Sequence, residues 1–141
     1  MCSNTSVFEF VQTSFECVKC DFIGGIIMSN TVQDISFEYA VKSVKFVQEM
    51  RKECRDYNLL NQFLRSATSV GANITEAQYP QSKADFISKM SIARKEANES
   101  KYWLNLFIAT ELVTEERVKE LMKYINNIIR LLNTIITSSK K

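Results

Sequence analysis

The sequence predicts an all-α protein, an antiparallel four-helix bundle with up-down-up-down connections. Apolar residues recur at spacings of three and four along four segments, as they do on the buried face of a helix. The 141 residues include only three Gly and one Pro, too few for the turns of a β-rich fold. The segments between the helices are short, which makes consecutive helices antiparallel. With 45% apolar residues, the chain is expected to form one domain with its own core.

The first 27 residues differ from the rest, because their apolar residues follow no sustained period and Gly24 and Gly25 interrupt them. They lack the basic region and the unbroken apolar stretch of a signal peptide. Met28 then opens a polar stretch, as a natural start of translation would. We therefore expect an N-terminal extension at 1–30 that is either disordered or the result of a mis-assigned start codon. A four-helix bundle is expected at 31–137 and a frayed tail at 138–141.

The first helix is predicted at 32–55, with Thr31 as its N-cap and Asp34 in the favourable first turn. Its buried stripe is predicted to consist of residues at helical spacing: Phe37, Val41, Val44, Val47, Met50 and Cys54. Tyr39 and Phe46 lie off this stripe, on a neighbouring face. They are candidate interface aromatics, because a lone bundle does not need this additional apolar surface.

The second helix is predicted at 59–78, before the break that Pro80 imposes. Its repeat contains alternatives at two positions: Leu60, Phe63 or Leu64, Ala67, Val70 or Gly71, Ile74 and Ala77. The middle of the helix is rich in small residues, which allow another helix to approach closely. A glycine inside a helix costs about 1 kcal/mol, so Gly71 is predicted to have a packing reason.

The third helix begins with Ser82 as N-cap and Asp85 in the position of a capping-box acid. Its stripe alternates by four and three in a heptad pattern: Phe86, Met90, Ala93, Ala97, Ser100, Leu104 and Phe107. The small central layers predict that helices two and three face each other at close range. Trp103 lies on a flanking face and is a third candidate interface aromatic.

The fourth helix begins after Thr114, with Glu115 and Glu116 matching the positive helix end. Its core stripe is predicted to be Val118, Leu121, Ile125, Ile128, Leu132 and Ile135. A second stripe of Met122, Ile129 and Ile136 runs beside it. Such doubled stripes indicate a helix that packs on its own bundle and on another subunit.

Two segments resemble a bacterial family of four-helix-bundle proteins first noted as products of intervening sequences in the 23S ribosomal RNA gene. The second-helix signature is Gln62-Phe63-Leu64-Arg65-Ser66-Ala67-Thr68-Ser69-Val70-Gly71-Ala72-Asn73-Ile74 followed by Glu76-Ala77, and the third-helix signature is Ser82, Asp85-Phe86, Lys89, Ile92-Ala93, Lys95-Glu96-Ala97, Glu99-Ser100 and Tyr102-Trp103-Leu104. The resemblance covers roughly residues 35–137. It implies a bundle that assembles into a ring, commonly a pentamer, with unknown biochemical activity. A related branch, the accessory variability proteins of diversity-generating retroelements, is similar in fold and binds nucleic acid and a reverse transcriptase.

The sequence offers no catalytic, cofactor or metal site. Histidine is absent, which removes the usual base and the commonest metal ligand. Cys17 and Cys20 have a spacing that suits zinc or redox chemistry, but a second ligand pair is missing. Polar residues near the second and third helices are candidates for fixing register or an interface, with a pairing to Arg65 or Lys95 expected: Arg65, Asn73, Glu76 and Lys95.

The predicted function is therefore that of a non-enzymatic, cytoplasmic homo-oligomer that acts as a scaffold or adaptor and also binds a protein partner, with no role in a membrane. The alternative is an RNA- or DNA-binding accessory protein, associated with ribosomal RNA or with a reverse transcriptase. The net charge of +2 gives no strong basic field, so contacts to nucleic acid depend on local clustering. The candidate contacts are on the first helix: Lys42, Lys45, Arg51, Lys52 and Arg55.

Overall fold

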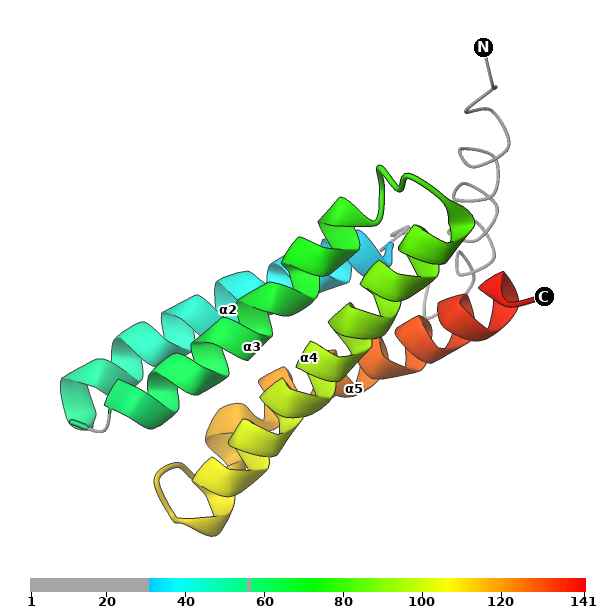
Figure 1. The fold of residues 1–141 in the computed structure, drawn as a ribbon. Helices are drawn as coiled ribbons and strands as arrows, with labels where there is room; N and C mark the ends of the chain where they lie inside the picture. The colour runs from blue at the N-terminus through cyan, green and yellow to red at the C-terminus, as the bar shows by residue number, and fades with distance from the viewer. Residues whose placement is uncertain (1–30, 56) are drawn as a thin grey trace, which may run out of the picture.

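The computed structural model describes residues 31–55 and 57–141. The predictions for an extension at 1–30, and for Cys17 and Cys20, lie outside the described residues. The described chain is entirely helical apart from its connections, with four helices in the order α2 (Val32–Glu53), α3 (Tyr57–Glu76), α4 (Lys83–Ala109) and α5 (Glu115–Ser139) (Figure 1).

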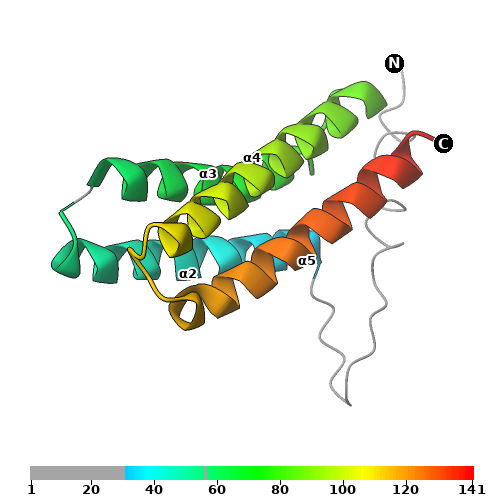
Figure 2. The ribbon, with the colours of Figure 1, turned by 90° about the horizontal axis from the view of Figure 1, so that it is seen from below.

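The four helices form the predicted antiparallel bundle. Each helix runs opposite to the one before it, and the views in Figures 1 and 2 agree on this arrangement. Helix α3 packs on α2 and α4, while α5 packs on α4 and on α2 and so closes the bundle. The α3–α4 pair has the most extensive contact, as the small residues in the middle of both helices predict.

The helix ends follow the capping signals to different degrees. Thr31 and Asp34 form a complete capping box, in which each side chain accepts a hydrogen bond from the other residue's backbone N–H. Ser82 caps α4 by accepting from the N–H of Asp85, but the Asp85 carboxylate accepts from Gln81 and the box is not reciprocal. Helix α5 extends to Ser139 and so includes the first two residues of the predicted frayed tail.

The predicted core stripes of α3, α4 and α5 are confirmed. All seven predicted stripe residues of α4 are buried, and so are the six of α5. In α3 the structure selects Phe63 over Leu64 and Val70 over Gly71. In the second stripe of α5, Ile136 is buried, whereas Met122 and Ile129 are half-buried at the edge of the core.

The predicted buried stripe of α2 is wrong in its first half. Phe37 is 70% exposed and Val41 is 38% exposed, whereas Tyr39 is fully buried and Phe46 is 7% exposed. The physical reason is that α2 carries two apolar stripes, and the core uses the one containing the larger aromatics. Tyr39 and Phe46 therefore belong to the core of the subunit, and their prediction as interface aromatics is wrong.

Aromatic rings and one hydroxyl pair hold the centre of the core. The ring of Phe63 contacts those of Phe46 and Phe107 edge-on, with centroids 5.9 and 5.8 Å apart, the arrangement that aromatic quadrupoles favour. The phenol of Tyr39 shares a buried hydrogen bond of 2.5 Å with the hydroxyl of Ser100 on α4. These contacts connect α2, α3 and α4 and fix which face of α2 points inward.

Candidate self-association surface

The second apolar stripe of α2 lies on the surface of the bundle. We call Phe37, Val41 and Val44 the outer α2 stripe; they are spaced by four and three residues, so they share one face of the helix. Phe37 and Val41 are exposed, and Val44 is half-buried. A row of large apolar side chains on a surface marks a contact site more often than isolated ones do.

A groove of about 400 Å³ borders this stripe between α2 and α3. Phe37 forms part of its wall, and Asp34 is the only charged residue among those that line it. The remaining lining residues are small or uncharged: Gln33, Ser36, Ala40, Thr68, Gly71, Ala72 and Thr75. An uncharged floor beside an exposed aromatic has the composition of the centre of a protein interface, which is depleted in charge and enriched in aromatic residues.

Gly71 lies in this groove, and packing within the subunit does not require a glycine there. A Cβ at this position would lie 3.6 Å from the carbonyl oxygen and the hydroxyl of Ser36, which is an ordinary contact. The predicted packing reason for Gly71 is therefore not found in the contact between α2 and α3. Its small size instead keeps the floor of the groove open.

We expect Gly71→Ala to stabilise the subunit by about 0.5–1 kcal/mol, because alanine favours the helix and restricts the unfolded chain. Urea unfolding at a low protein concentration measures this free energy. Ala72→Gly is the matched control, since it makes the opposite change at the next residue and should destabilise by a similar amount. A loss of stability in Gly71→Ala would show that α2 and α3 are too close to admit a methyl group.

The four candidate register residues do not form one cluster. Glu76 joins α3 to α4, as expected of a register residue, but its partner is Lys89 and not Arg65 or Lys95. This hydrogen bond raises the pKa of Lys89. The amide of Asn73 donates to the carbonyl of Ser69 within α3. Arg65 and Lys95 are exposed, and neither forms the predicted pair with another described residue.

The five candidate nucleic-acid contacts, four on α2 and Arg55 just after it, do not form one basic face. Lys42 points to α5, where its amine lies 2.8 Å from the Glu120 carboxylate, and this hydrogen bond raises the pKa of Lys42. Arg51 points to α3 and donates to Asn61 over 2.6 Å. Lys45, Lys52 and Arg55 are exposed as well, whereas Lys42 is half-buried. Two of the five cations are therefore engaged in bonds between helices of the same subunit.

A polar seam closes the bundle between α2 and α5. Arg117 donates two hydrogen bonds to Glu53, at 2.6 and 2.8 Å, and this bond lowers the pKa of Glu53. Tyr124 donates to Glu38 over 2.8 Å, which raises the pKa of Tyr124. The sequence reasoning missed this seam. The sequence contains one indication of this seam. Acidic side chains lie beside the core stripe of α2, and their hydrogen-bond donors lie beside the core stripe of α5.

A second apolar surface lies on the side of α4 that is near α3. Ile92 is 39% exposed and Trp103 is half-buried. The step of eleven residues from one to the other makes three helical turns, which places both on one face. The Trp103 indole donates to Glu99 over 3.4 Å. Because Trp103 is partly exposed, it is accessible to another subunit. Its role as an interface aromatic stays a prediction.

The structure provides no donor set for a metal within residues 31–55 and 57–141, where no three His, Cys, Asp or Glu residues are grouped. No helix in these two ranges is both long and apolar enough to cross a membrane. The arrangement of α2 to α5 thus defines a class: an antiparallel four-helix bundle with exposed apolar surface on two of its helices.

The chain belongs to the 23S rRNA-intervening sequence protein family, whose model matches residues 28–134. A solved structure of a protein with unknown function, from the S23 ribosomal protein family of Bacteroides thetaiotaomicron, has the same fold, with a TM-score of 0.72. That protein is 46% identical to this chain, and the match covers 74% of this chain and 97% of the other. No curated protein matches the chain. The resemblance expected from the two helical signatures is confirmed.

Proposed function

We propose that this protein is a non-enzymatic scaffold that assembles with copies of itself through the outer α2 stripe and the adjoining groove. The observation that carries the proposal is the exposure of Phe37 beside a groove floored by small residues. Burying a phenylalanine side chain contributes about 1.5–3 kcal/mol, so a contact here would gain much from this one residue. The absence of histidine and the structural roles of the described polar groups support a function without catalysis.

The two apolar surfaces support a ring. The outer α2 stripe and the surface with Ile92 and Trp103 are on different helices of one subunit. A contact between them would be head-to-tail, and head-to-tail contacts close into a ring when the rotation between subunits allows it. The earlier resemblance implies such a ring, commonly of five subunits. Three of the four cysteines lie within the first 20 residues and are not spread through the fold as a disulfide framework would be, which supports a reducing, cytoplasmic location.

Phe37→Ser should shift the full chain from an oligomer toward the monomer, because serine removes the largest apolar contact and leaves the fold unstrained at an exposed position. The measurement is the molar mass by light scattering after size-exclusion chromatography, across a range of protein concentrations. Far-ultraviolet circular dichroism checks that the helices remain.

The matched control is Tyr79→Ser, which removes an aromatic side chain that is 85% exposed but does not line the groove. It should leave the mass unchanged. A wild-type protein that is monomeric at all concentrations would refute the proposal, and so would a Phe37→Ser variant with the wild-type mass.

A further inference from the structure

The four helices are held in the core by different kinds of contact. The ring of Phe63 contacts aromatic rings of α2 and α4, and the phenol of Tyr39 is hydrogen-bonded to Ser100 of α4. These directional contacts connect α2, α3 and α4. The buried side chains of α5 are aliphatic except for Ser139 at its end. Helix α5 is therefore held in the core by aliphatic packing, which is non-directional.

The contact between α2 and α5 depends on its polar seam. It is the least extensive of the four contacts between neighbouring helices. Arg117 of α5 pairs with Glu53 of α2 at 2.6 Å. Lys42 of α2 pairs with Glu120 of α5 at 2.8 Å, and its amine also lies 5.4 Å from the centroid of the Tyr124 ring, within the range of a cation–π contact. We call Arg117 and Lys42 the latch cations, because both join α5 to α2.

The latch cations face more carboxylates than they can neutralise. The pKa of each cation is raised, chiefly by the hydrogen bond to its own glutamate. For Arg117 the charge of Glu49 adds to this effect, and for Lys42 the charge of Glu38 does so. The carboxylates that interact with the two cations are those of Glu38, Glu49, Glu53 and Glu120. Removing either cation would therefore leave negative charges facing each other between α2 and α5.

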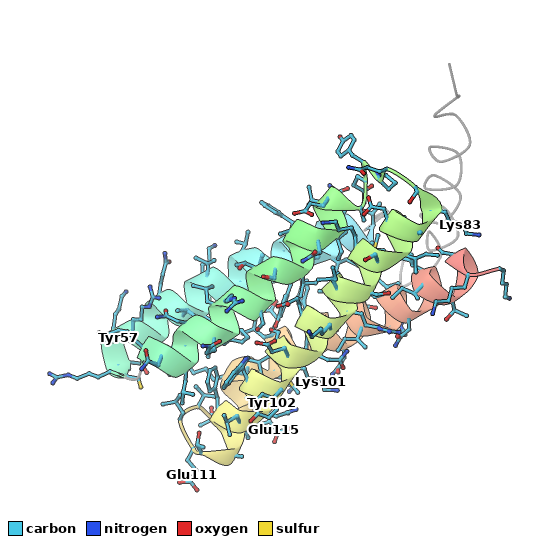
Figure 3. The ribbon with its side chains drawn as sticks, viewed as in Figure 1. Tyr57, Lys83, Lys101, Tyr102, Glu111 and Glu115 are labelled. Atoms are coloured by element: carbon cyan, nitrogen blue, oxygen red, sulfur yellow. The ribbon has the colours of Figure 1, made fainter. Side chains whose placement is uncertain are left out.

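The turn that connects α4 to α5 contains a strained residue. Glu111, labelled in Figure 3, has a φ of 57°, a left-handed conformation that favours glycine because a Cβ is crowded there. The amides of Glu111 and Leu112 donate to the carbonyls of Ile108 and Phe107, so hydrogen bonds at the end of α4 hold the turn in this shape. The strain is released when the turn opens.

We propose that α5 opens as a unit from α2 by pivoting about the α4–α5 turn, and that the latch cations keep it closed. This motion exposes the aliphatic face of α5 but leaves the contacts of Phe63 and Tyr39 intact in the other three helices. Helix α2 could not leave the bundle without breaking both. The latch cations thus control how often the aliphatic face of α5 is exposed, a property that does not depend on self-association.

Hydrogen–deuterium exchange of the full chain, corrected for intrinsic rates, tests the proposal. The centre of α5, residues 121–132, should exchange at least about tenfold faster than the centres of α3 and α4, residues 63–74 and 93–104, because it opens without global unfolding. Arg117→Gln should raise the rate in α5 about threefold further. Glu111→Gly should lower the rate in α5 about threefold, because glycine removes the strain of the closed turn.

The matched control is Lys89→Gln, which removes a cation paired with Glu76 across α3 and α4. The Lys89 side chain is 32% exposed and that of Arg117 is 33% exposed. Lys89→Gln should leave the rate in α5 unchanged. Light scattering and circular dichroism establish equal assembly and folding, and Lys42→Gln replaces Arg117→Gln if that variant misfolds.

Faster exchange in α5 that Arg117→Gln raises and Lys89→Gln does not supports the proposal. It is overturned by equal rates in α3, α4 and α5, by faster exchange in α2 than in α5, or by equal effects of the two substitutions. An unchanged α5 rate in Glu111→Gly would overturn the pivot at the turn.

Discussion

Phe63→Ala is expected to destabilise the bundle by about 3–5 kcal/mol, because it removes a fully buried ring and leaves a cavity. Phe63 is inaccessible to solvent, and its ring contacts Phe46 of α2 on one side and Phe107 of α4 on the other. One substitution therefore removes aromatic contacts that connect three helices. A domain of this size is stable by only about 5–15 kcal/mol, so a large part of the population should unfold on mild heating.

Urea unfolding followed by circular dichroism measures this loss, with an unchanged dependence on urea showing that the unfolded surface is the same. Tyr79→Ala is the control, since an aromatic side chain that is 85% exposed should change stability by less than about 0.5 kcal/mol. A loss below about 1 kcal/mol in Phe63→Ala would show that the core repacks and that the ring contacts contribute little.

Tyr39→Phe is expected to cost about 1–3 kcal/mol, although it removes only one oxygen atom. The lost phenol leaves the buried hydroxyl of Ser100 without its partner, and an unpaired buried hydroxyl costs its full desolvation. The hydroxyl of Ser43, one turn along α2, is buried and has no hydrogen-bond partner among the described residues. Because the Ser43 hydroxyl is close enough to affect the pKa of Tyr39, a new hydrogen bond between Ser43 and Ser100 would bring the loss to the lower end of this range.

The double variant Tyr39→Phe/Ser100→Ala should recover most of this loss, because both polar partners are then absent. The comparison of single and double variants in urea isolates the hydrogen bond from the change in shape. Equal stability of Tyr39→Phe and the wild type would show that the hydroxyl pair contributes nothing to folding.

Tyr39 should also make the free energy of unfolding decrease at alkaline pH. Burial raises the pKa of Tyr39 above the ordinary value of 10.0, so the folded protein keeps a proton that the unfolded chain releases. The contribution of Tyr39 to the free energy of unfolding is complete below pH 10. Above pH 10 it falls by about 1.4 kcal/mol per pH unit, until the pH reaches the pKa of Tyr39 in the folded protein. Urea unfolding at pH 9 and 11 should show a smaller loss in Tyr39→Phe than in the wild type.

Helices α3, α4 and α5 could be predicted from the sequence almost residue by residue. Each has one dominant apolar stripe at helical spacing, so a single face of the helix satisfies the core. Phe63 and Val70 were each one of two alternatives, because at both places two consecutive residues, Phe63 and Leu64 or Val70 and Gly71, fit the period. Packing selected the residues whose side chains lie between α2 and α4.

Helix α2 and the candidate surfaces were less predictable. Periodicity locates the apolar faces of a helix, but it does not show whether each face meets another helix or solvent. The wrong stripe included Phe37 and Val41 because they have the same spacing as a core face. Likewise, counting lysines and arginines along α2 could not show that Lys42 reaches Glu120 and Arg51 reaches Asn61. Those pairings join residues that are far apart in the chain or on separate helices.

The sequence by itself determined that this protein is an antiparallel bundle of four helices, because the spacing of apolar residues and the shortness of the connections are local properties. The family followed from two local signatures. Only the tertiary structure decided that Tyr39 is buried while Phe37 is exposed, and that Lys42 of α2 pairs with Glu120 of α5. Both outcomes depend on which helices meet, and a side chain's burial or charge partner is set by groups distant in sequence.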